Sequence, residues 1–351
     1  MTSNATQSNL TAMQLPLLGL MLGDYTGIGA EQCARVLSDG RLNDAARLLV
    51  VGDTRVLEQG ARDAGVTLNW RAYPAPEEVD WSRDGIPVID LKNLDPATIK
   101  RGQMSPESGQ VTGETLAWMI NLALAGRLDG ITFAPLNKGA LYAGGWRFND
   151  EHQMFAQLTG QTGYFSEMNV LDNLWMSRVT SHVALKTALE QITPERIDQA
   201  ITLADRTMRS AGISEPRIAV AALNPHGGEN GLFGRDEIEI IAPTVARAAA
   251  RGINCRGPFP ADTVFLKAFA GDYDGVLTMY HDQGQIATKL KGFNRGVTVT
   301  AGLKTIFTTP AHGTAFDIVG KGCASTGALE QAVRLGARLA ASRKHATTSH
   351  Q

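Results

Sequence analysis

The stretch LPLLGLMLGDYTGIGAEQCARVL, residues 15–37, decides the fold class of this chain. It begins with an apolar run at Leu15–Leu22, passes through a glycine-rich turn at Gly23–Glu31 and ends in a helical pattern at Ala30–Leu37. A short apolar run bounded by glycine is typical of a strand buried on both faces. A turn that opens a helix directly after a strand suits an anion or ligand at the helix N-terminus, although a plain tight turn would also explain the glycines. The stretch therefore predicts a strand–turn–helix unit of an α/β protein.

Apolar runs and helical patterns alternate along the rest of the chain in the same way. Thr193-Pro194-Glu195 is a good helix start, because the threonine hydroxyl can cap a helix that the proline opens. Regular alternation favours an α/β protein with a largely parallel sheet. Further strands are expected at Leu48–Gly52, Pro87–Leu91, Ile131–Pro135, Ile218–Leu223, Gly275–Tyr280 and Val297–Thr300, and helices at Gly113–Ala125, Met154–Leu158, Pro194–Ser210, Asp236–Arg251 and Gly327–Ala341.

The length of 351 residues is enough for about two domains. No linker rich in proline, glycine or serine divides the sequence, which two lobes joined by crossing strands would explain. We expect residues 1–130 and 297–351 to form the first α/β lobe, and residues 131–296 to form the second.

Composition narrows the class of protein. Hydrophobic residues make up 43% and charged residues 19%, which is typical of a globular chain. The net charge of -2 and the lack of a basic stripe argue against a nucleic-acid partner. The run Leu15–Leu22 is too short to span a membrane, and Cys33, Cys255 and Cys323 are too far apart and odd in number for a disulfide framework. We therefore expect a cytoplasmic protein with no membrane contact.

Three histidines follow apolar runs that we interpret as strands. His182, His226 and His281 each come just after such a run, within one predicted lobe. Loops at strand ends are where α/β folds build their sites, so the three imidazoles could converge on a divalent metal. Their spacings of 44 and 55 residues match no local zinc-finger pattern, so structural or merely exposed histidines stay an open alternative.

A second glycine-rich segment, AHGTAFDIVGKG, begins at Ala311 and ends at Gly322. Two small residues follow His312, which leaves a flat surface on which a ring could stack. A plain loop would explain the same residues equally well.

Taken in order, these motifs resemble the 4-hydroxythreonine-4-phosphate dehydrogenase family of vitamin B6 (pyridoxine) synthesis. The resemblance extends from about Leu17 to Ala328. It rests on GDYTGIGAE at Gly23–Glu31, TSH at Thr180–His182, LNPHGGE at Leu223–Glu229, GPFPADT at Gly257–Thr263, YHDQG at Tyr280–Gly284 and HGTAFDIVGKG at His312–Gly322. The last motif is also similar to the adenosine-side loop of isopropylmalate and isocitrate dehydrogenases.

The resemblance implies a fold, cofactors and a reaction. The fold would be that of the isocitrate and isopropylmalate dehydrogenases, with two α/β lobes around a cleft. The protein would oxidise the secondary alcohol of a 3-hydroxy acid, with decarboxylation, and would form a homodimer with shared active sites. NAD or NADP would bind at His312, Gly313, Thr314, Ala315 and Asp317, and one divalent ion per subunit (Zn, Mg, Mn or Co) would bind at His182, His226 and His281.

The resemblance also assigns substrate and catalytic residues, with two departures. His152 and the adjacent Gln153 fall on a substrate motif, Lys289 on a substrate-binding and catalytic lysine, and Asp262 on a catalytic acid. The family's substrate-binding Asn and Arg are replaced by Thr298 and Phe307 in this chain. Loss of a guanidinium matters where a phosphate must be held, and Phe307 offers an apolar face. We therefore expect weak activity on the phosphorylated substrate, with a cyclohexadiene diol carboxylate of the terephthalate dihydrodiol type as the alternative.

Two other classes of protein come into consideration. Phosphate acyltransferases share the general fold but use neither metal nor NAD, and an inactive relative would serve only for binding. Retention of all three histidines and of the HGTA loop speaks against both.

Overall fold

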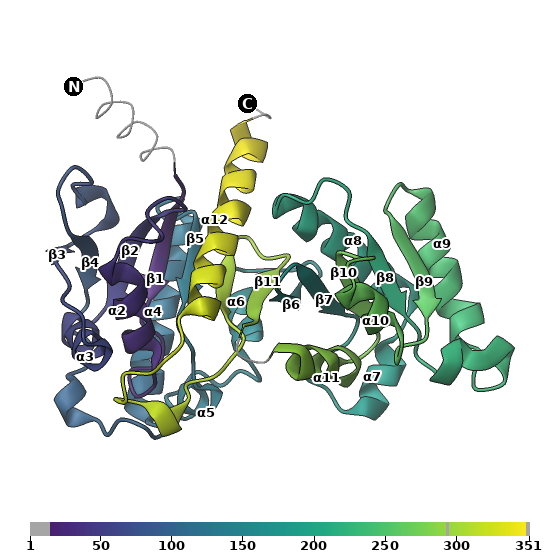
Figure 1. The fold of residues 1–351 in the computed structure, drawn as a ribbon, viewed down its shortest axis with the longest axis horizontal. Coiled ribbons are helices and arrows are strands. Elements are labelled where there is room, and N and C mark those ends of the chain that lie inside the picture. Colours follow the sequence, from purple (N-terminus) through teal and green to yellow (C-terminus); the bar gives the residue numbers. More distant parts are fainter. Residues whose placement is uncertain (1–14, 293–294, 349–351) are drawn as a thin grey trace. The chain divides into compact units, whose positions relative to one another are not determined.

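The structure is a computed structural model that describes residues 15–292 and 295–348. The chain divides into two compact units, unit 1 with Met1–Gln161 and Leu303–Gln351 and unit 2 with Thr162–Gly302. Figure 1 labels most of the helices and strands of both units. Both boundaries lie later in the chain than the predicted ones near 130 and 297. The first one shifts because strand β5 (Gly130–Phe133) pairs in parallel with strands at both of its edges that belong to unit 1.

Unit 1 is built on a parallel sheet. Its strands follow the order β3 (Trp70–Tyr73), β4 (Ile86–Asp90), β2 (Arg47–Gly52), β1 (Leu17–Met21), β5 and β12 (Phe307–Pro310). Its helices are α2 (Gly29–Ser38), α3 (Thr54–Ala64), α4 (Pro106–Leu124), α5 (Lys138–Ala143), α6 (Glu151–Leu158) and α12 (Gly327–Thr348), with short 3-10 turns at Pro76–Glu78, Pro96–Thr98 and Phe316–Ile318.

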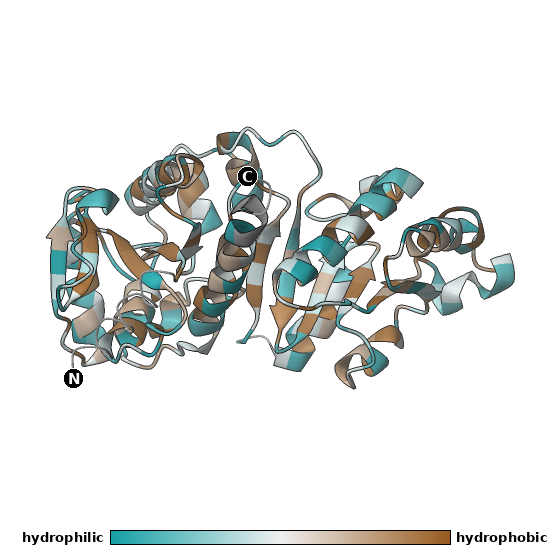
Figure 2. Cartoon of the chain, turned by 90° about the horizontal axis from the view of Figure 1, so that it is seen from above, coloured by the Kyte–Doolittle hydropathy of each residue, from teal (hydrophilic) through white to brown (hydrophobic). Residues whose placement is uncertain are grey.

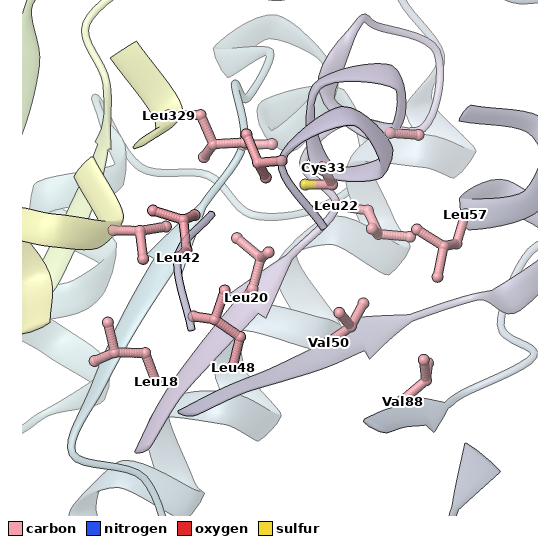
Figure 3. Packing of buried hydrophobic residues seen from close by; sticks show 14 of the residues in the cluster. Leu18, Leu20, Leu22, Cys33, Leu42, Leu48, Val50, Leu57, Val88 and Leu329 are labelled. Atoms are coloured by element: carbon pink, nitrogen blue, oxygen red, sulfur yellow. The ribbon is translucent and has the colours of Figure 1, made fainter. Parts of the chain in front are cut away.

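Strand β1 is buried on both faces, as its continuous apolar run predicts. Leu18 and Leu20 join a core cluster that includes Cys33 of α2 and Leu329 of α12 (Figure 3). On the opposite face, a Cβ atom added to Gly19 would lie 2.5 Å from the terminal methyl group of Met119 on α4, so a larger residue here would displace that side chain. Helices therefore cover β1 from both sides.

Unit 2 is built on a mixed sheet. Its strands follow the order β11 (Val297–Ala301), β6 (Ser166–Leu171), β7 (Leu174–Arg178), β10 (Gly275–Thr278), β8 (Ile218–Ala221) and β9 (Cys255–Phe259). The pairs β11–β6 and β6–β7 are antiparallel and the other three pairs are parallel. Its helices are α7 (Leu185–Gln191), α8 (Pro194–Ser210), α9 (Ala242–Ala250), α10 (Val264–Phe269) and α11 (His281–Gly292), with a 3-10 segment at Pro225–Gly231 and a π-helical turn at Glu237–Ile241.

Helix α8 confirms the predicted capping signal. Its first residue is Pro194, and the Thr193 hydroxyl accepts a hydrogen bond from the backbone N–H of Arg196 at 3.3 Å. In both units, hydrophobic residues gather on the strands and on the helix faces that cover them (Figure 2). Among the helices in the described part of the chain, none combines the length and the apolar character needed to cross a membrane.

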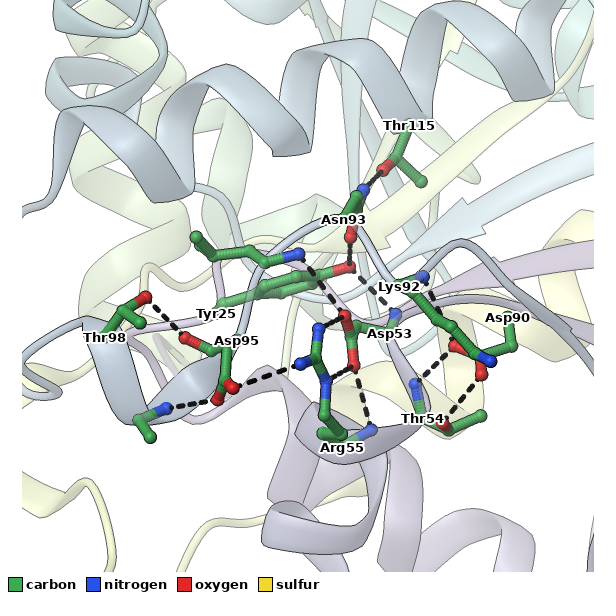
Figure 4. A network of polar contacts seen from close by, with 12 residues as sticks. Tyr25, Asp53, Thr54, Arg55, Asp90, Lys92, Asn93, Asp95, Thr98 and Thr115 are labelled. Atoms are coloured by element: carbon green, nitrogen blue, oxygen red, sulfur yellow. Dashed lines mark hydrogen bonds and ion pairs between the residues drawn. The ribbon is translucent and has the colours of Figure 1, made fainter.

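A network of polar contacts holds the glycine-rich turn of unit 1 (Figure 4). The phenol of Tyr25 accepts from the backbone N–H of Asp53 and donates to the Asn93 amide oxygen, both at 3.0 Å. The Asp53 carboxylate in turn accepts two hydrogen bonds from the Arg55 guanidinium, at 2.9 and 2.8 Å. Burial raises the pKa of Tyr25 far above its usual value, so the phenol keeps its proton. Tyr25 is therefore a structural anchor of this turn.

Candidate active site

The three histidines of unit 2 follow three neighbouring parallel strands. His182 comes after β7, His281 starts α11 after β10, and His226 lies in the 3-10 segment after β8. Strand β10 lies between β7 and β8 and is parallel to both. Because the carboxyl ends of parallel strands meet at one edge of a sheet, all three histidines are carried by the same edge of unit 2.

Two of these histidines lie side by side. The ring centroids of His182 and His281 are 5.6 Å apart, with the ring planes tilted by 49°. The Asp282 carboxylate lies 2.7 Å from Nδ1 of His281, which leaves Nε2 for a ligand. A carboxylate on the second nitrogen is the usual arrangement around metal-binding histidines. The donor set of this pair therefore fits a divalent metal.

His226 stands apart from that pair. It is exposed, and its ring lies 6.1 Å from the ring of Phe233. Over residues 15–292 and 295–348, the structure contains no group of three or more His, Cys, Asp or Glu side chains placed to hold a metal ion. The structure thus brings together two of the three predicted ligands within one chain.

The loop that carries His226 has an unusual backbone. His226, Glu229 and Asn230 have φ values of 53°, 41° and 55°, in the left-handed region that costs non-glycine residues free energy. The buried carboxylate of Glu237 holds the start of this loop. It accepts from the backbone N–H groups of Leu223 and Asn224 at 2.8 and 2.7 Å, and from the Asn224 side-chain amide at 3.0 Å. Because Glu237 fixes Leu223 and Asn224, which come just before the loop, the loop can keep a strained conformation.

A buried polar cluster lies beside His182. The Arg178 guanidinium bonds to the Glu167 carboxylate at 2.8 Å and to the Asn169 amide oxygen at 3.1 Å, and the other Glu167 oxygen lies 3.8 Å from Nε2 of His182. The Asn169 amide donates to the Thr298 hydroxyl at 3.0 Å. Sequence patterns did not identify Glu167, Asn169 and Arg178 as residues of the site. Charged residues inside apolar strands were the available signal.

The other predicted substrate and catalytic residues are divided between the units. Unit 2 holds Thr298, which is buried, and Lys289 and Asp262, which are exposed. Unit 1 holds His152, which is buried and has its ring 6.4 Å from that of Phe155, and Gln153, which is exposed.

The expectation for Phe307 needs correction. Its side chain is only 1% exposed, and its ring stacks on that of Phe155 with centroids 4.1 Å apart. The apolar face that we expected a substrate ring to use is therefore covered by the protein itself. The sequence pattern could not reveal this, because the covering ring comes from a distant helix.

The two glycine-rich segments of unit 1 meet. The backbone N–H of Ile28 donates to the Thr314 carbonyl at 3.2 Å, and a Cβ atom on Gly27 would lie 2.9 Å from the Thr314 side chain. At the start of the second segment, His312 contacts Gln32 of α2, and burial lowers the pKa of His312. Gly313 and Asp317 are exposed, and Ala315 has a φ of 45°. This contact places the loop predicted for the cofactor at the N-terminus of α2, where anions are favoured.

The chain is an α/β protein with histidines at the ends of parallel strands in unit 2 and glycine-rich loops at a helix N-terminus in unit 1. A family model described as pyridoxal phosphate biosynthetic protein PdxA matches residues 44–336. The chain belongs to this family, as its motifs predict.

The relatives are dehydrogenases. A protein of Pseudomonas aeruginosa, named as a candidate second 4-hydroxythreonine-4-phosphate dehydrogenase, is 46% identical over 334 residues, covering 94% of this chain and 98% of the relative. The D-threonate 4-phosphate dehydrogenase of Cupriavidus necator is 43% identical over 330 residues, covering 94% and 98%. Such proteins act on a hydroxyl group, so this chain is an oxidoreductase of the predicted type.

Solved structures agree with the fold class. The 4-hydroxythreonine-4-phosphate dehydrogenase of Klebsiella pneumoniae is 38% identical with a TM-score of 0.79, covering 93% of this chain and 98% of that one. The terephthalate 1,2-cis-dihydrodiol dehydrogenase of Burkholderia xenovorans is less similar, at 26% identity and a TM-score of 0.65, covering 92% and 98%. The predicted α/β fold is confirmed.

Proposed function

We propose that this chain uses NAD or NADP and one divalent metal ion per subunit to oxidise the secondary alcohol of a small phosphorylated hydroxy acid. The observation that carries the proposal is the pairing of His182 and His281 at the ends of adjacent parallel strands, in a chain whose relatives are dehydrogenases. We also propose that the protein works in the cytoplasm.

His182 and His281 would hold the metal ion, with His226 as the third ligand. Bound there, a divalent ion supplies Lewis-acid stabilisation of the oxygen from which the alcohol proton departs. Asp282 orients the His281 ring through the 2.7 Å contact. Lys289 and Asp262 are the proposed groups for orienting the acid and moving a proton. Oxidation of a hydroxyl β to a carboxylate gives a β-keto acid, so we propose that decarboxylation follows.

The position of His226 leads us to propose a homodimer with shared active sites. Within one chain this ring is not in the His182–His281 group, so a ligand from a second subunit would complete the set. The surface near the histidines supports this proposal, because exposed apolar side chains at such density are typical of protein interfaces. They include Val183 and Leu185 beside His182, Leu232 and Phe233 after His226, and Ile286 and Leu290 on α11, with exposed fractions from 45% to 84%.

Subunit mixing tests the shared site. His226→Ala and His281→Ala each remove one ligand and should be inactive alone. If the two ligands of one site come from different subunits, a mixed dimer contains one complete site. Random exchange should then restore about a quarter of the wild-type activity. No recovery after exchange verified by mass spectrometry would place each metal site within a single chain.

The substrate class follows from two observations. The relative from Cupriavidus necator is named for D-threonate 4-phosphate and is 43% identical, against 26% for the terephthalate dihydrodiol enzyme. In addition, the burial of Phe307 removes the apolar surface that favoured a ring-shaped substrate. The cyclic diol carboxylate therefore becomes the second candidate. The replacement of the family's Arg by Phe307 is the observation that still favours it.

The test is a comparison of specificity constants. The metal-loaded protein is assayed with NAD and with NADP for formation of reduced nicotinamide on 4-hydroxythreonine 4-phosphate, D-threonate 4-phosphate and the terephthalate dihydrodiol. We expect a phosphorylated acid to give the highest kcat/KM. The proposal fails if the diol exceeds both phosphorylated acids, or if activity survives complete removal of the metal. A phosphate acyltransferase would reduce no nicotinamide with any of them.

A further inference from the structure

Gln32 is a buried amide whose contacts fix its orientation. It lies on α2 with no exposed surface, and its Nε2 donates to the Ser325 carbonyl oxygen at 2.6 Å. The same nitrogen lies 3.2 Å from Nε2 of His312. Exchanging the amide oxygen and nitrogen would place two acceptors against each other at Ser325. The nitrogen must therefore face both Ser325 and His312.

These contacts determine which nitrogen of His312 carries the proton. An amide nitrogen only donates, so Nε2 of His312 must accept and carries no hydrogen. The other ring nitrogen, Nδ1, lies 3.0 Å from the Gly313 carbonyl oxygen, which only accepts, so Nδ1 must carry the hydrogen. The geometry leaves one state in which both contacts are hydrogen bonds, the neutral imidazole with its hydrogen on Nδ1.

The Gln32 amide destabilises the fold in a way that a nonpolar residue at this position would not. Its Oε1 is buried and has no hydrogen-bond partner among the residues that the structure describes. An unpaired buried acceptor destabilises a fold, and a leucine or methionine would fill the same space without one. Nearby, Glu31 accepts from the Ala324 N–H at 2.9 Å and Arg35 donates to the Gly322 carbonyl, so α2 already anchors this loop without Gln32. Anchoring of the loop therefore does not by itself explain the amide.

We propose that Gln32 is a positioning residue that holds His312 as a neutral imidazole in a fixed ring plane, so that the adenine of the nicotinamide cofactor packs against an uncharged ring. The inference rests on the proposed cofactor placement. Both ring nitrogens are engaged in the plane of the ring, which leaves its faces for stacking. An imidazolium could not accept from Gln32, so the amide selects against the charged form.

The protonation state can be measured without cofactor. Nitrogen-15 NMR of protein labelled at the histidine rings distinguishes the two neutral tautomers and the cation, and His312→Asn identifies the His312 signals. We expect the Nδ1–H tautomer in the wild type and a mixture of states in Gln32→Leu. Gln32→Glu should favour a hydrogen on Nε2, because a carboxylate only accepts. The proposal is overturned if the wild type has its hydrogen on Nε2, or if Gln32→Leu leaves the tautomer unchanged.

Kinetics then test the consequence for the cofactor. Loss of one ordinary hydrogen bond should raise the KM for the cofactor about 2- to 10-fold in Gln32→Leu, with little change in kcat. Ser38→Ala, at the exposed end of the same helix, is the matched control and should change neither quantity. Arg35→Ala loosens the loop and should leave the tautomer intact. An unchanged KM beside an altered tautomer would refute the role in cofactor binding, whereas a wild type that binds no cofactor would refute the proposed function instead.

Discussion

Replacement of Glu237 by alanine should loosen the loop that presents His226. The Glu237 carboxylate is 3% exposed and accepts from the backbone N–H groups of both Leu223 and Asn224. Hydrogen bonds to a charged group are worth about 1.5–3 kcal/mol each. Leu223 and Asn224 are half-buried, so water can replace part of the loss, and the lower value applies. We therefore expect the two backbone contacts together to contribute about 3 kcal/mol.

Hydrogen exchange followed by mass spectrometry measures this effect locally. A loss of about 3 kcal/mol corresponds to exchange faster by about two orders of magnitude at the Leu223 and Asn224 amides. Because the loop carries a predicted ligand, the affinity for Zn²⁺ or Co²⁺ should fall as well. Glu239→Ala is the matched control. Glu239 is exposed and pairs with Arg235 one helical turn away, a contact worth less than about 1 kcal/mol.

Equal exchange rates of these amides in the Glu237→Ala and Glu239→Ala proteins would show that Glu237 does not hold the loop. A protein that exchanges faster but binds metal with unchanged affinity would preserve the structural argument. In that case, His226 would not be a ligand that depends on the loop conformation.

Three further predictions concern the buried residues. Arg178→Met should destabilise the protein by about 3–5 kcal/mol, because it leaves Glu167 without its guanidinium, and Arg178→Met combined with Glu167→Gln should recover most of the loss in urea unfolding. Phe307→Arg places a charge against Phe155 and should lower Tm without raising kcat/KM for the phosphorylated acids. A stable variant with higher activity would show that the side chain at position 307 reaches the substrate. Burial holds the pKa of His312 below the ordinary value of 6.5, so the unfolded chain gains a proton first as pH falls. His312 should therefore lower the free energy of unfolding below about pH 6.5, and His312→Gln should make that free energy less dependent on pH.

Sequence patterns predicted the strands with continuous apolar runs, including β1 and the four-residue strands β5, β8 and β10. They missed β3, which has two exposed residues among four, and β12, which has two threonines among four residues. The apolar run that precedes His182 includes the turn of the hairpin β6–β7, with Asp172 at a φ of 53° in that turn. Helix α3 was missed although its signals were present, with Asp53 as N-cap and Gly65 in the left-handed C-terminal position.

The histidines of the candidate site were predictable from the sequence, but neither their grouping nor the polar cluster of Glu167, Asn169 and Arg178 was. Strand ends located all three histidines on one sheet edge, because parallel strands impose that arrangement. Periodicity says nothing of a loop with left-handed residues, so the separation of His226 from His182 and His281 could not be foreseen. The burial of Phe307 was equally hidden, because it depends on a stacking partner from α6.

The two departures from the family pattern have different structural consequences. Thr298 lies opposite Asn169 in the β11–β6 register, and that amide donates to its hydroxyl at 3.0 Å. The side-chain amide that the family has at position 298 is thus replaced by the amide of Asn169 on the neighbouring strand β6. Position 307 lies in unit 1, and the Phe307 ring is buried against Phe155, so this position offers no charge to an anion. In unit 2, the Arg178 guanidinium is buried and paired with Glu167, so we expect an anionic substrate to meet exposed cations such as Lys289, where solvent screening weakens each contact.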